Sequence, residues 1–328
     1  MSARNVLADR HHAGLFRSLQ LLADRLGWTL YTPQGRAWWD ADYWAFGRRT
    51  YGDDRLARQF LGASGPDEEF PDAPVRYVSL EEARAMPWAF VIASLDDNQA
   101  GFARFAAETG ARYLVQCGNT GQYIDWSLDP IVLNSSEMPL LGRGVTYHQE
   151  LDPVFRWAEP WARRSVRSFV HLMNETHAFP IWNYLAESLP DFGFQRFGHA
   201  PPNPDPTYVE NAKPIAKIAA LMARSGWGFH DKPVGDGHGH VIHGWSAIGR
   251  PLIGHGSHYA GKMAGVFWQD LVTCIDLDLH PLPEAAALIR EISADPDRHA
   301  AMCRAIRGVF DATVDYDAEA VAIRELLA

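Results

Sequence analysis

The alternation of short apolar segments with longer segments of helical periodicity restricts the fold of this chain more than any other feature. Residues 14–27 carry Leu15, Leu19, Leu22 and Leu26 at helical spacing and end on a glycine, as helices often do. Apolar runs of strand length lie on both sides of this segment. In the first 150 residues we expect strands at 5–9, 28–33, 75–80, 90–95, 112–118 and 130–135, and a second helix at 99–110. Strands separated by helices of this length favour a parallel sheet with helices on both faces.

The same alternation begins again near residue 165. We expect strands at 165–173, 192–198, 227–232, 250–256 and 272–278, with helices at 180–190, 212–226, 258–267 and throughout 281–328. A change of composition at 152–164 marks a linker, and 328 residues exceed what one hydrophobic core usually holds. We therefore predict two α/β domains, at 1–160 and 161–312, and a final helix at 313–328 that returns to the first domain.

The composition narrows the class of protein. No stretch approaches the roughly 18 apolar residues of a membrane span, and Arg4, Asp9 and Arg10 stand where a signal peptide has its apolar core. The three cysteines are scattered and form no CxxC pair, so we expect a cytoplasmic protein. A formal net charge of −10 disfavours binding of nucleic acid over the whole surface and leaves only a local basic groove for it.

The segment GDGHGHVIHGWSAIGRP, residues 235–251, follows a predicted strand and is the strongest candidate for ligand binding. Gly237 and Gly239 allow the backbone to approach a ligand closely. A helix that begins near His238 or Gly239 would point its free N–H groups and the positive end of its dipole at that ligand. This arrangement suits an anion such as a diphosphate.

Residues 236–253, DGHGHVIHGWSAIGRPLI, resemble the C-terminal signature of GT-B glycosyltransferases, particularly the GT4-like group. Residues 11–33, HHAGLFRSLQLLADRLGWTLYTP, are similar to the opening of such enzymes, and the chain is loosely similar to glycosyltransferase-like proteins of phages and bacteria. The resemblance implies the GT-B type of α/β fold, in which two Rossmann-like, doubly wound domains face a central cleft. It also implies a nucleotide-sugar as co-substrate, with no cofactor and no metal.

The resemblance assigns the donor to the second domain, where Lys232, Arg250 and a helix N-terminus would neutralise the leaving diphosphate. The candidate donor-binding residues are Lys232, Asp236, Gly237, His238, Gly239, His240, Arg250, Ser257, Tyr259 and Lys262. The sequence departs from the family at Gly244, where the signature has a second carboxylate, and at 171–180, which lacks the usual Arg and Lys. These departures leave the nucleotide and the stereochemical course of the reaction open.

The first domain would supply the acceptor site and a general base. His11 and His12 follow the first predicted strand, and imidazole titrates near neutral pH, so either is a candidate base. Asp96 follows another strand and is either a base or part of the cap of the next helix. The aromatic segment 38–54 is predicted to be a lid or an acceptor surface, with packing on the first domain as the alternative. The candidate acceptor-binding residues are Trp38, Trp39, Tyr43, Trp44, Arg48 and Asn119.

We expect a hexosyl- or pentosyltransferase that moves a sugar from a nucleotide-sugar to a hydroxyl of a glycan, a small molecule or a hydroxylated DNA base. Two alternatives stay open. His238, His240 and His243 are close enough in sequence to share a metal ion in a metal-dependent hydrolase, although they also fit hydrogen-bonding roles in a tight corner. The missing second carboxylate fits a nucleotide-sugar binding protein without turnover. A nicotinamide-dependent dehydrogenase is disfavoured, because residues 9–14 lack GxGxxG.

Overall fold

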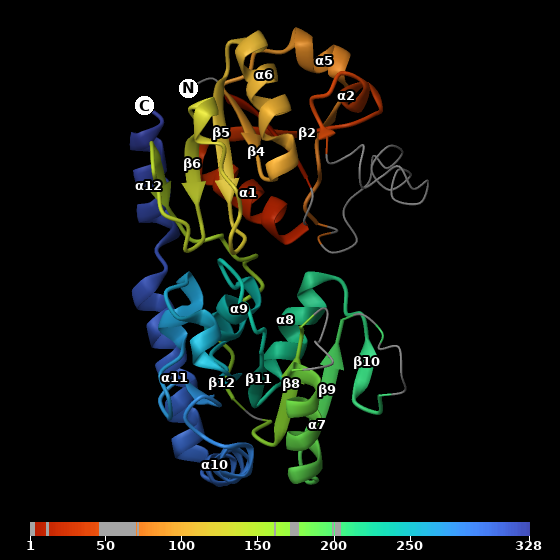
Figure 1. Cartoon of the computed structure of the whole chain (residues 1–328). Coiled ribbons are helices and arrows are strands. Elements are labelled where there is room, and N and C mark those ends of the chain that lie inside the picture. The colour runs from red at the N-terminus through yellow and green to blue at the C-terminus, as the bar shows by residue number, and fades with distance from the viewer. Residues whose placement is uncertain are drawn as a thin grey trace. The chain divides into compact units, whose positions relative to one another are not determined.

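The computed structural model describes residues 4–10, 13–45, 70, 72–160, 162–170, 177–198, 200 and 205–328. Contacts divide the chain into two compact units, which we call unit 1 (Met1–Glu150 with Tyr316–Ala328) and unit 2 (Leu151–Asp315). Each unit contains a parallel sheet with helices packed on it (Figure 1). Among the described residues, no helix combines the length and the apolar character that crossing a membrane requires.

The described strands of unit 1 form a parallel sheet in the order β3-β2-β1-β4-β5-β6-β7. They are β1 (Arg4–Ala8), β2 (Trp28–Pro33), β3 (Tyr77–Val78), β4 (Phe90–Ala93), β5 (Arg112–Cys117), β6 (Ile131–Asn134) and β7 (Gly144–Thr146). The order reverses between β1 and β4, so the carboxyl ends of these neighbouring strands form a topological switch point. The expected strands of this half are therefore present, and β7 is added to them.

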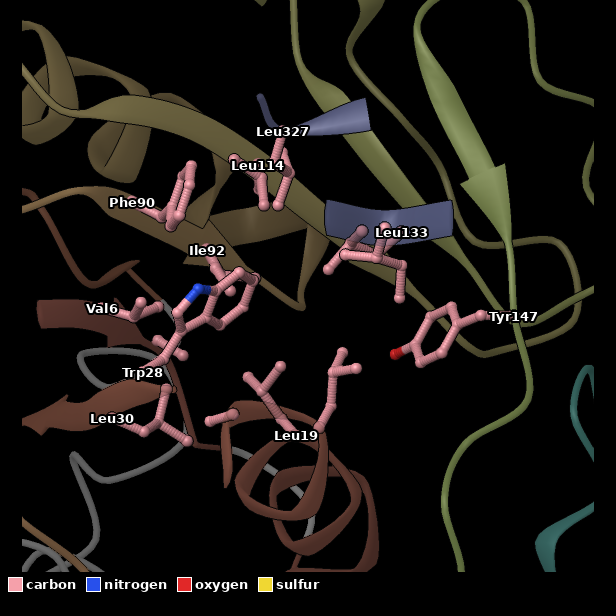
Figure 2. Close-up of a cluster of buried hydrophobic side chains, with 14 of the residues drawn as sticks. Val6, Leu19, Trp28, Leu30, Phe90, Ile92, Leu114, Leu133, Tyr147 and Leu327 are labelled. Atoms are coloured by element: carbon pink, nitrogen blue, oxygen red, sulfur yellow. The ribbon is translucent and has the colours of Figure 1, made fainter. Parts of the chain in front are cut away.

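Helices cover both faces of the unit 1 sheet, because successive residues of a strand point to opposite faces. The described helices are α1 (Ala13–Leu26), α2 (Ala37–Asp40), α5 (Leu80–Ala85), α6 (Gln99–Thr109) and α12 (Tyr316–Leu326). Val6 belongs to a buried cluster with Leu19 of α1 and with Leu327, next to the end of α12 (Figure 2). Leu7 belongs to a second cluster with side chains of α2, α5 and α6. The C-terminal helix thus completes the core of unit 1.

The aromatic residues predicted to form an acceptor surface lie in this second cluster. Trp38, Trp39, Tyr43 and Trp44 are at most 8% exposed. Rings that are this deeply buried cannot stack on a sugar or a base. The structure therefore corrects the prediction for these four residues in favour of packing on the first domain. Arg48, the fifth candidate of this segment, lies outside the described residues.

Unit 2 contains a parallel sheet in the order β10-β9-β8-β11-β12-β13. Its strands are β8 (Ser165–Ser168), β9 (Gly193–Phe197), β10 (Tyr208–Glu210), β11 (Trp227–Phe229), β12 (Leu252–Gly254) and β13 (Cys274–Asp276). Its described helices are α7 (Ala178–Ser188), α8 (Ile215–Ala223), α9 (His240–Ile248), α10 (Leu282–Ala294) and α11 (Pro296–Thr313). The helix expected at 258–267 is replaced by two short 3₁₀ turns, η3 (Gly256–Tyr259) and η4 (Met263–Phe267).

The two compact units divide after Glu150 and after Asp315. The sequence-based boundaries, after residues 160 and 312, stand as predictions. Trp157 shows why the segment 151–160 packs with unit 2: its ring lies against Gly249, where an added Cβ would come 2.2 Å from the indole.

Candidate functional site

The unit 2 sheet reverses its strand order between β8 and β11, so its switch point lies at the carboxyl ends of these two strands. β11 is followed directly by His230 and Asp231, and β12, its neighbour, is followed by His255. His177 is the N-cap residue of α7, the next described element after β8 in the chain. The topology therefore brings polar side chains from three separate parts of the sequence to one edge of the sheet.

Three imidazoles surround the Asp231 carboxylate, whose side chain is 0% exposed. His255 Nδ1 lies 3.1 Å from both carboxylate oxygens. His258 Nδ1 lies 3.0 Å from Oδ1, and His177 Nε2 lies 3.0 Å from Oδ2. One potential ligand atom from each of these residues lies within 4.8 Å of the others. We call His177, Asp231, His255 and His258 the histidine cluster.

The electrostatics of the histidine cluster follow from burial and charge. Burial by itself raises the pKa of Asp231, but the hydrogen bond from His255 and the charges of the three imidazoles outweigh burial and hold that pKa below its ordinary value. The hydrogen bond to Asp231 raises the pKa of His255, whereas burial lowers the pKa of His258. His177 Nε2 and His258 Nδ1 are buried, and neither forms a well-aligned hydrogen bond within the described residues. All three imidazoles thus lie within 3.1 Å of the carboxylate, but two of their buried nitrogens lack a well-aligned hydrogen bond.

A second group of charges lies in the loop after β11. Asp236 accepts hydrogen bonds from His230, at 3.2 Å, and from the Lys232 ammonium. Burial raises the pKa of Asp236, but His230 and Lys232 together overcome this effect and keep that pKa well below its usual range. Asp236 is thus a permanent anion, and Lys232, with 42% of its side chain exposed, is the cation next to it.

The glycine motif turns the chain from this loop into α9. Gly235 and Gly239 have φ values of +67° and +77°, which favour glycine, and Gly239 is the N-cap residue of α9. A Cβ at Gly235 would lie 2.2 Å from the carbonyl oxygen of His258, so the motif packs directly on η3. The first N–H groups of α9 have no partner within the helix and carry the positive end of its dipole.

The three motif histidines lie together but are not spaced to share one ion. The rings of His238 and His243 stack at 4.0 Å between centroids, and the His238 and His240 rings are 6.0 Å apart. His243 Nδ1 lies 3.0 Å from the carbonyl oxygen of Gly239, as expected of a histidine that supports a corner. Within the described part of the chain, the histidine cluster is the group whose spacing suits a metal, and the trio is not.

Arg250 has a structural role that replaces its predicted contact with the donor. Its side chain is fully buried at the C-terminal end of α9, and its guanidinium donates hydrogen bonds to five backbone carbonyl groups. The acceptors are the carbonyl oxygens of Ala158, Glu159, Ala223, Ile248 and Gly249. The resemblance singled out Arg250 near the end of the signature, but in this structure the charge of Arg250 stabilises backbone carbonyl dipoles.

The predicted residues of η3 and the following turn divide into two kinds. Tyr259 is 0% exposed and its ring stacks on Trp268 at 5.1 Å, so its side chain is core and cannot contact a donor. Ser257 is exposed and donates a hydrogen bond from Oγ to Asp278 at 2.9 Å. The ammonium of Lys262 bonds to the carbonyl oxygen of Val234, which places a second cation beside the glycine motif.

The catalytic candidates of unit 1 are only partly described. His11 and His12 lie outside the described residues. Asp96 is exposed at the start of a 3₁₀ turn (Asp96–Asn98) after β4, and burial of part of its carboxyl raises its pKa. Asn119 is exposed after β5, and its backbone N–H donates to Gln122 Oε1 at 3.3 Å. Both exposed side chains remain candidates for contact with an acceptor.

The sequence analysis missed the histidine cluster completely, and it also missed Asp9 at the switch point of unit 1. Asp9 is 2% exposed and accepts hydrogen bonds of 2.7 Å from Ser94 N and Asn98 Nδ2. Burial raises the pKa of Asp9 to about 6, against the opposing effect of these hydrogen bonds. A signal existed in each case, because His230-Asp231, His255 and Asp9 directly follow strands.

Comparison with known proteins shows the fold. No protein-family model matches the sequence, and a search of curated proteins found no relative. Solved structures match over nearly the whole chain. HepE of Anabaena with UDP and glucose has a TM-score of 0.64 at 12% identity, with 99% of each chain covered. An alpha-glucosyltransferase with UDP-glucose and DNA containing an abasic site has a TM-score of 0.67 at 10% identity, again with 99% of each chain covered.

A third match is the sucrose-phosphate synthase of Thermosynechococcus elongatus, with a TM-score of 0.64 at 10% identity and 98% of each chain covered. The matched structures are GT-B glycosyltransferases. The chain therefore has the GT-B fold, and the fold class predicted from the sequence is confirmed.

Proposed function

We propose that this protein is a glycosyltransferase that takes a hexosyl group from a nucleotide-sugar, UDP-glucose or a close analogue, and transfers it to an acceptor hydroxyl. The observation that carries this proposal is the whole-chain match to proteins solved with UDP or UDP-glucose. The carboxyl edge of the unit 2 sheet supports it independently, since it offers the partly exposed Lys232 and the N-terminus of α9 beside a switch point.

In this proposal the donor diphosphate binds at the N-terminus of α9. The backbone N–H groups of Gly237 to His240 and the ammonium groups of Lys232 and Lys262 face the negative charge. That charge grows on the leaving diphosphate as its bond to the anomeric carbon breaks, so fixed positive groups stabilise the transition state more than the ground state. Arg250 and Tyr259 are omitted from this role because both are fully buried.

The acceptor oxygen forms the new bond to the anomeric carbon and must lose its proton. Asp96 is the described candidate for this base, since it is exposed at a strand end and its raised pKa moves it toward the working pH. His11 and His12 are the other candidates, on the strength of the sequence alone. A variant of the correct base should lower kcat and leave the affinity for the donor unchanged, because the base touches only the acceptor.

A matched pair of lysine variants tests the donor site. Lys232 and Lys217 each have 42% of the side chain exposed and each pairs with one carboxylate, but Lys217 lies on α8 and pairs with Glu210 of β10. We expect Lys232→Ala to weaken UDP binding about tenfold, a loss of about 1.4 kcal/mol, and Lys217→Ala to leave it unchanged. Isothermal titration with UDP, GDP and ADP gives the affinities and names the nucleotide.

Turnover is measured as release of UDP from UDP-glucose in the presence of an acceptor panel. The panel contains free sugars, sugar phosphates and DNA that carries the HMU base, because such DNA is bound in one matched structure. Turnover with one acceptor class supports the proposal and identifies that class. Tight UDP binding with no release on any acceptor would favour a binding protein, and absence of nucleotide binding would overturn the proposal.

A further inference from the structure

We propose that the histidine cluster binds one divalent transition-metal ion of the zinc type, with His177, Asp231, His255 and His258 as its ligands. The spacing of the four potential ligand atoms, within 4.8 Å of one another, carries the proposal. It goes beyond the proposed glycosyl transfer, and it stands or falls separately, because binding of a metal is measured without nucleotide or turnover.

The ligand types select the class of metal. Imidazole nitrogen suits zinc, copper, iron, cobalt and nickel, whereas magnesium and calcium prefer sites made only of oxygen. Three imidazoles and one carboxylate also match the usual four-coordinate number of zinc in proteins. The cluster therefore predicts binding of Zn²⁺ or Co²⁺ and a much weaker response to Mg²⁺.

The geometry requires only a small contraction. Ligands about 2.0–2.1 Å from a tetrahedral zinc ion are about 3.3–3.4 Å apart. The Asp231 oxygens are already 3.0–3.1 Å from one nitrogen of each histidine. The imidazole centroids lie 5.0, 5.1 and 5.3 Å apart, so the rings enclose one common point rather than forming a row. Rotation of side chains that are partly exposed is enough to bring the remaining pairs closer.

A simple network of hydrogen bonds explains the cluster less well. His177 Nε2 and His258 Nδ1 are buried and close to the carboxylate, yet neither forms a well-aligned hydrogen bond among the described residues. A buried ring nitrogen without such a bond costs free energy unless another partner satisfies it. A metal ion satisfies both nitrogens and the buried carboxylate at once.

The site is accessible and joins separate elements. The three histidine side chains are 31%, 19% and 15% exposed, so an ion can enter from solvent, while Asp231 is fully covered. Four protein ligands fill a tetrahedral ion, which indicates a structural metal rather than one that activates water. The ion would tie the N-terminal end of α7 to the segments that follow β11 and β12, at the switch point of unit 2.

The first experiment uses the wild-type full chain, freed of metal with a chelator and dialysed. Titration with Co²⁺ should give visible absorption bands of a tetrahedral nitrogen–oxygen site that saturate at one ion per chain. Zn²⁺ should displace Co²⁺ and abolish the bands. Zn²⁺ should also raise the melting temperature, because it binds only the folded state, whereas an equal concentration of Mg²⁺ should not. Absence of bands and of any thermal shift with Zn²⁺ overturns the proposal.

The second experiment assigns the ion to these residues. His177→Gln and His258→Gln change partly exposed ligands, and each should weaken Zn²⁺ binding at least tenfold. His280→Gln is the matched control, since His280 also contacts carboxylates, at 2.8 and 3.1 Å, but lies outside the cluster. Binding that survives both cluster variants, as it would at the 238/240/243 trio, overturns the assignment. If both variants fail to fold by circular dichroism, the wild-type Co²⁺ bands decide alone.

Discussion

Each sheet has a buried aspartate at its switch point, and the two aspartates have opposite surroundings. Asp9 follows β1 at the switch point of unit 1, and Asp231 follows β11 at the switch point of unit 2. Neutral groups contact Asp9, and burial raises its pKa to about 6. Imidazoles contact Asp231, and their hydrogen bond and charges overcome burial and lower its pKa. The switch point thus holds a protonatable acid in unit 1 and a permanent anion in unit 2.

The neutral groups of unit 1 form a closed network. Ser94 Oγ donates to Gln116 Oε1 at 3.1 Å, and Gln116 Nε2 donates to Tyr147 Oη at 2.7 Å. Gln122 Nε2 donates to the carbonyl oxygens of Ser94 and Gln116. Hydrogen bonds of this kind satisfy the ends of β1, β4 and β5 internally and fix the backbone there. The network thus fixes the backbone next to exposed residues such as Asp96.

The edge of unit 2 differs because two buried imidazole nitrogens of the histidine cluster have no well-aligned hydrogen bond among the described residues. The imidazole nitrogens of the histidine cluster surround the buried Asp231 carboxylate, and Lys232, with 42% of its side chain exposed, pairs with Asp236. Groups that remain poorly satisfied in the isolated chain are groups that a ligand can satisfy. The contrast teaches that burial alone does not mark a binding site at a switch point; the balance of donors and acceptors does.

The largest effect is expected at a charge that lies at neither switch point. Arg250→Met should lower the free energy of unfolding by about 4 kcal/mol, because several buried carbonyl oxygens lose their only described charged donor. Urea unfolding followed by tryptophan fluorescence measures the loss. Folded Arg250→Met should bind UDP with unchanged affinity. Weakened UDP binding without loss of stability would show that Arg250 contacts the donor, and would contradict its assignment as a structural residue.

Arg250 also shows how far the sequence alone could lead. The strand and helix periodicities located the parallel sheets, and the signature at 236–253 led to the GT-B fold, since both depend on local patterns. Whether the guanidinium of a Gly-Arg-Pro segment points to a ligand or to the end of its own helix depends on tertiary packing. Here Trp157 packs on Gly249, and the arginine beside it meets carbonyl groups from segments far apart in the sequence.

The aromatic segment and the histidine cluster both show that features which depend on tertiary contacts cannot be predicted from local sequence. Trp38 and Trp44 lack helical periodicity, which suggested a surface loop, but a short helix and a turn place them over the sheet. The histidine cluster joins position 177 to positions 231 and 255–258, and nothing in the local sequence reveals that these residues meet. Only the parallel topology does, because it brings the carboxyl ends of β8, β11 and β12 to one edge.

The second largest effect is a difference in pH dependence between the two aspartates. In the folded state the pKa of Asp9 is about 6, above its ordinary value of 3.8, so the folded protein retains a proton that the unfolded chain loses. This stabilisation is fully present below about pH 4 and is lost as the pH rises toward 6. In the wild type, the free energy of unfolding should therefore fall by about 3 kcal/mol over this pH range. Asp9→Asn has no titrating group here and should not show this fall. Urea unfolding at pH 4, 5, 6 and 7 gives both profiles, and parallel profiles would contradict the protonated state of Asp9.

Asp231→Asn makes the same chemical change at the other switch point and should have the opposite consequence at neutral pH. The amide removes the charge that His255 and its neighbours contact, and it leaves buried ring nitrogens with fewer acceptors. We expect the free energy of unfolding at pH 7 to fall by about 1–3 kcal/mol. The free energy of unfolding of Asp9→Asn should not fall by this amount at pH 7, because the charge is removed there from neutral surroundings. Equal losses in the two variants would remove the distinction between the edges.

The smallest effect compares two hydroxyl groups that follow strands β3 and β12. Ser79 is the N-cap of α5, where its Oγ accepts from Glu82 N at 3.2 Å and Glu82 Oε2 accepts from Ser79 N at 2.9 Å in a capping box. Ser257 Oγ bonds to Asp278, but the Ser257 N–H bonds to the same carboxylate at 2.7 Å and remains after removal of the hydroxyl. We expect Ser79→Ala to lower the free energy of unfolding, measured by urea unfolding, by about 1 kcal/mol and Ser257→Ala to lower it by less than about 0.5 kcal/mol. The Ser79 hydroxyl caps a helix in unit 1, whereas Ser257 is exposed at the edge of unit 2. A larger loss of stability at Ser257 than at Ser79 would show that Ser257 has a structural role, against our assignment of this edge to ligand binding.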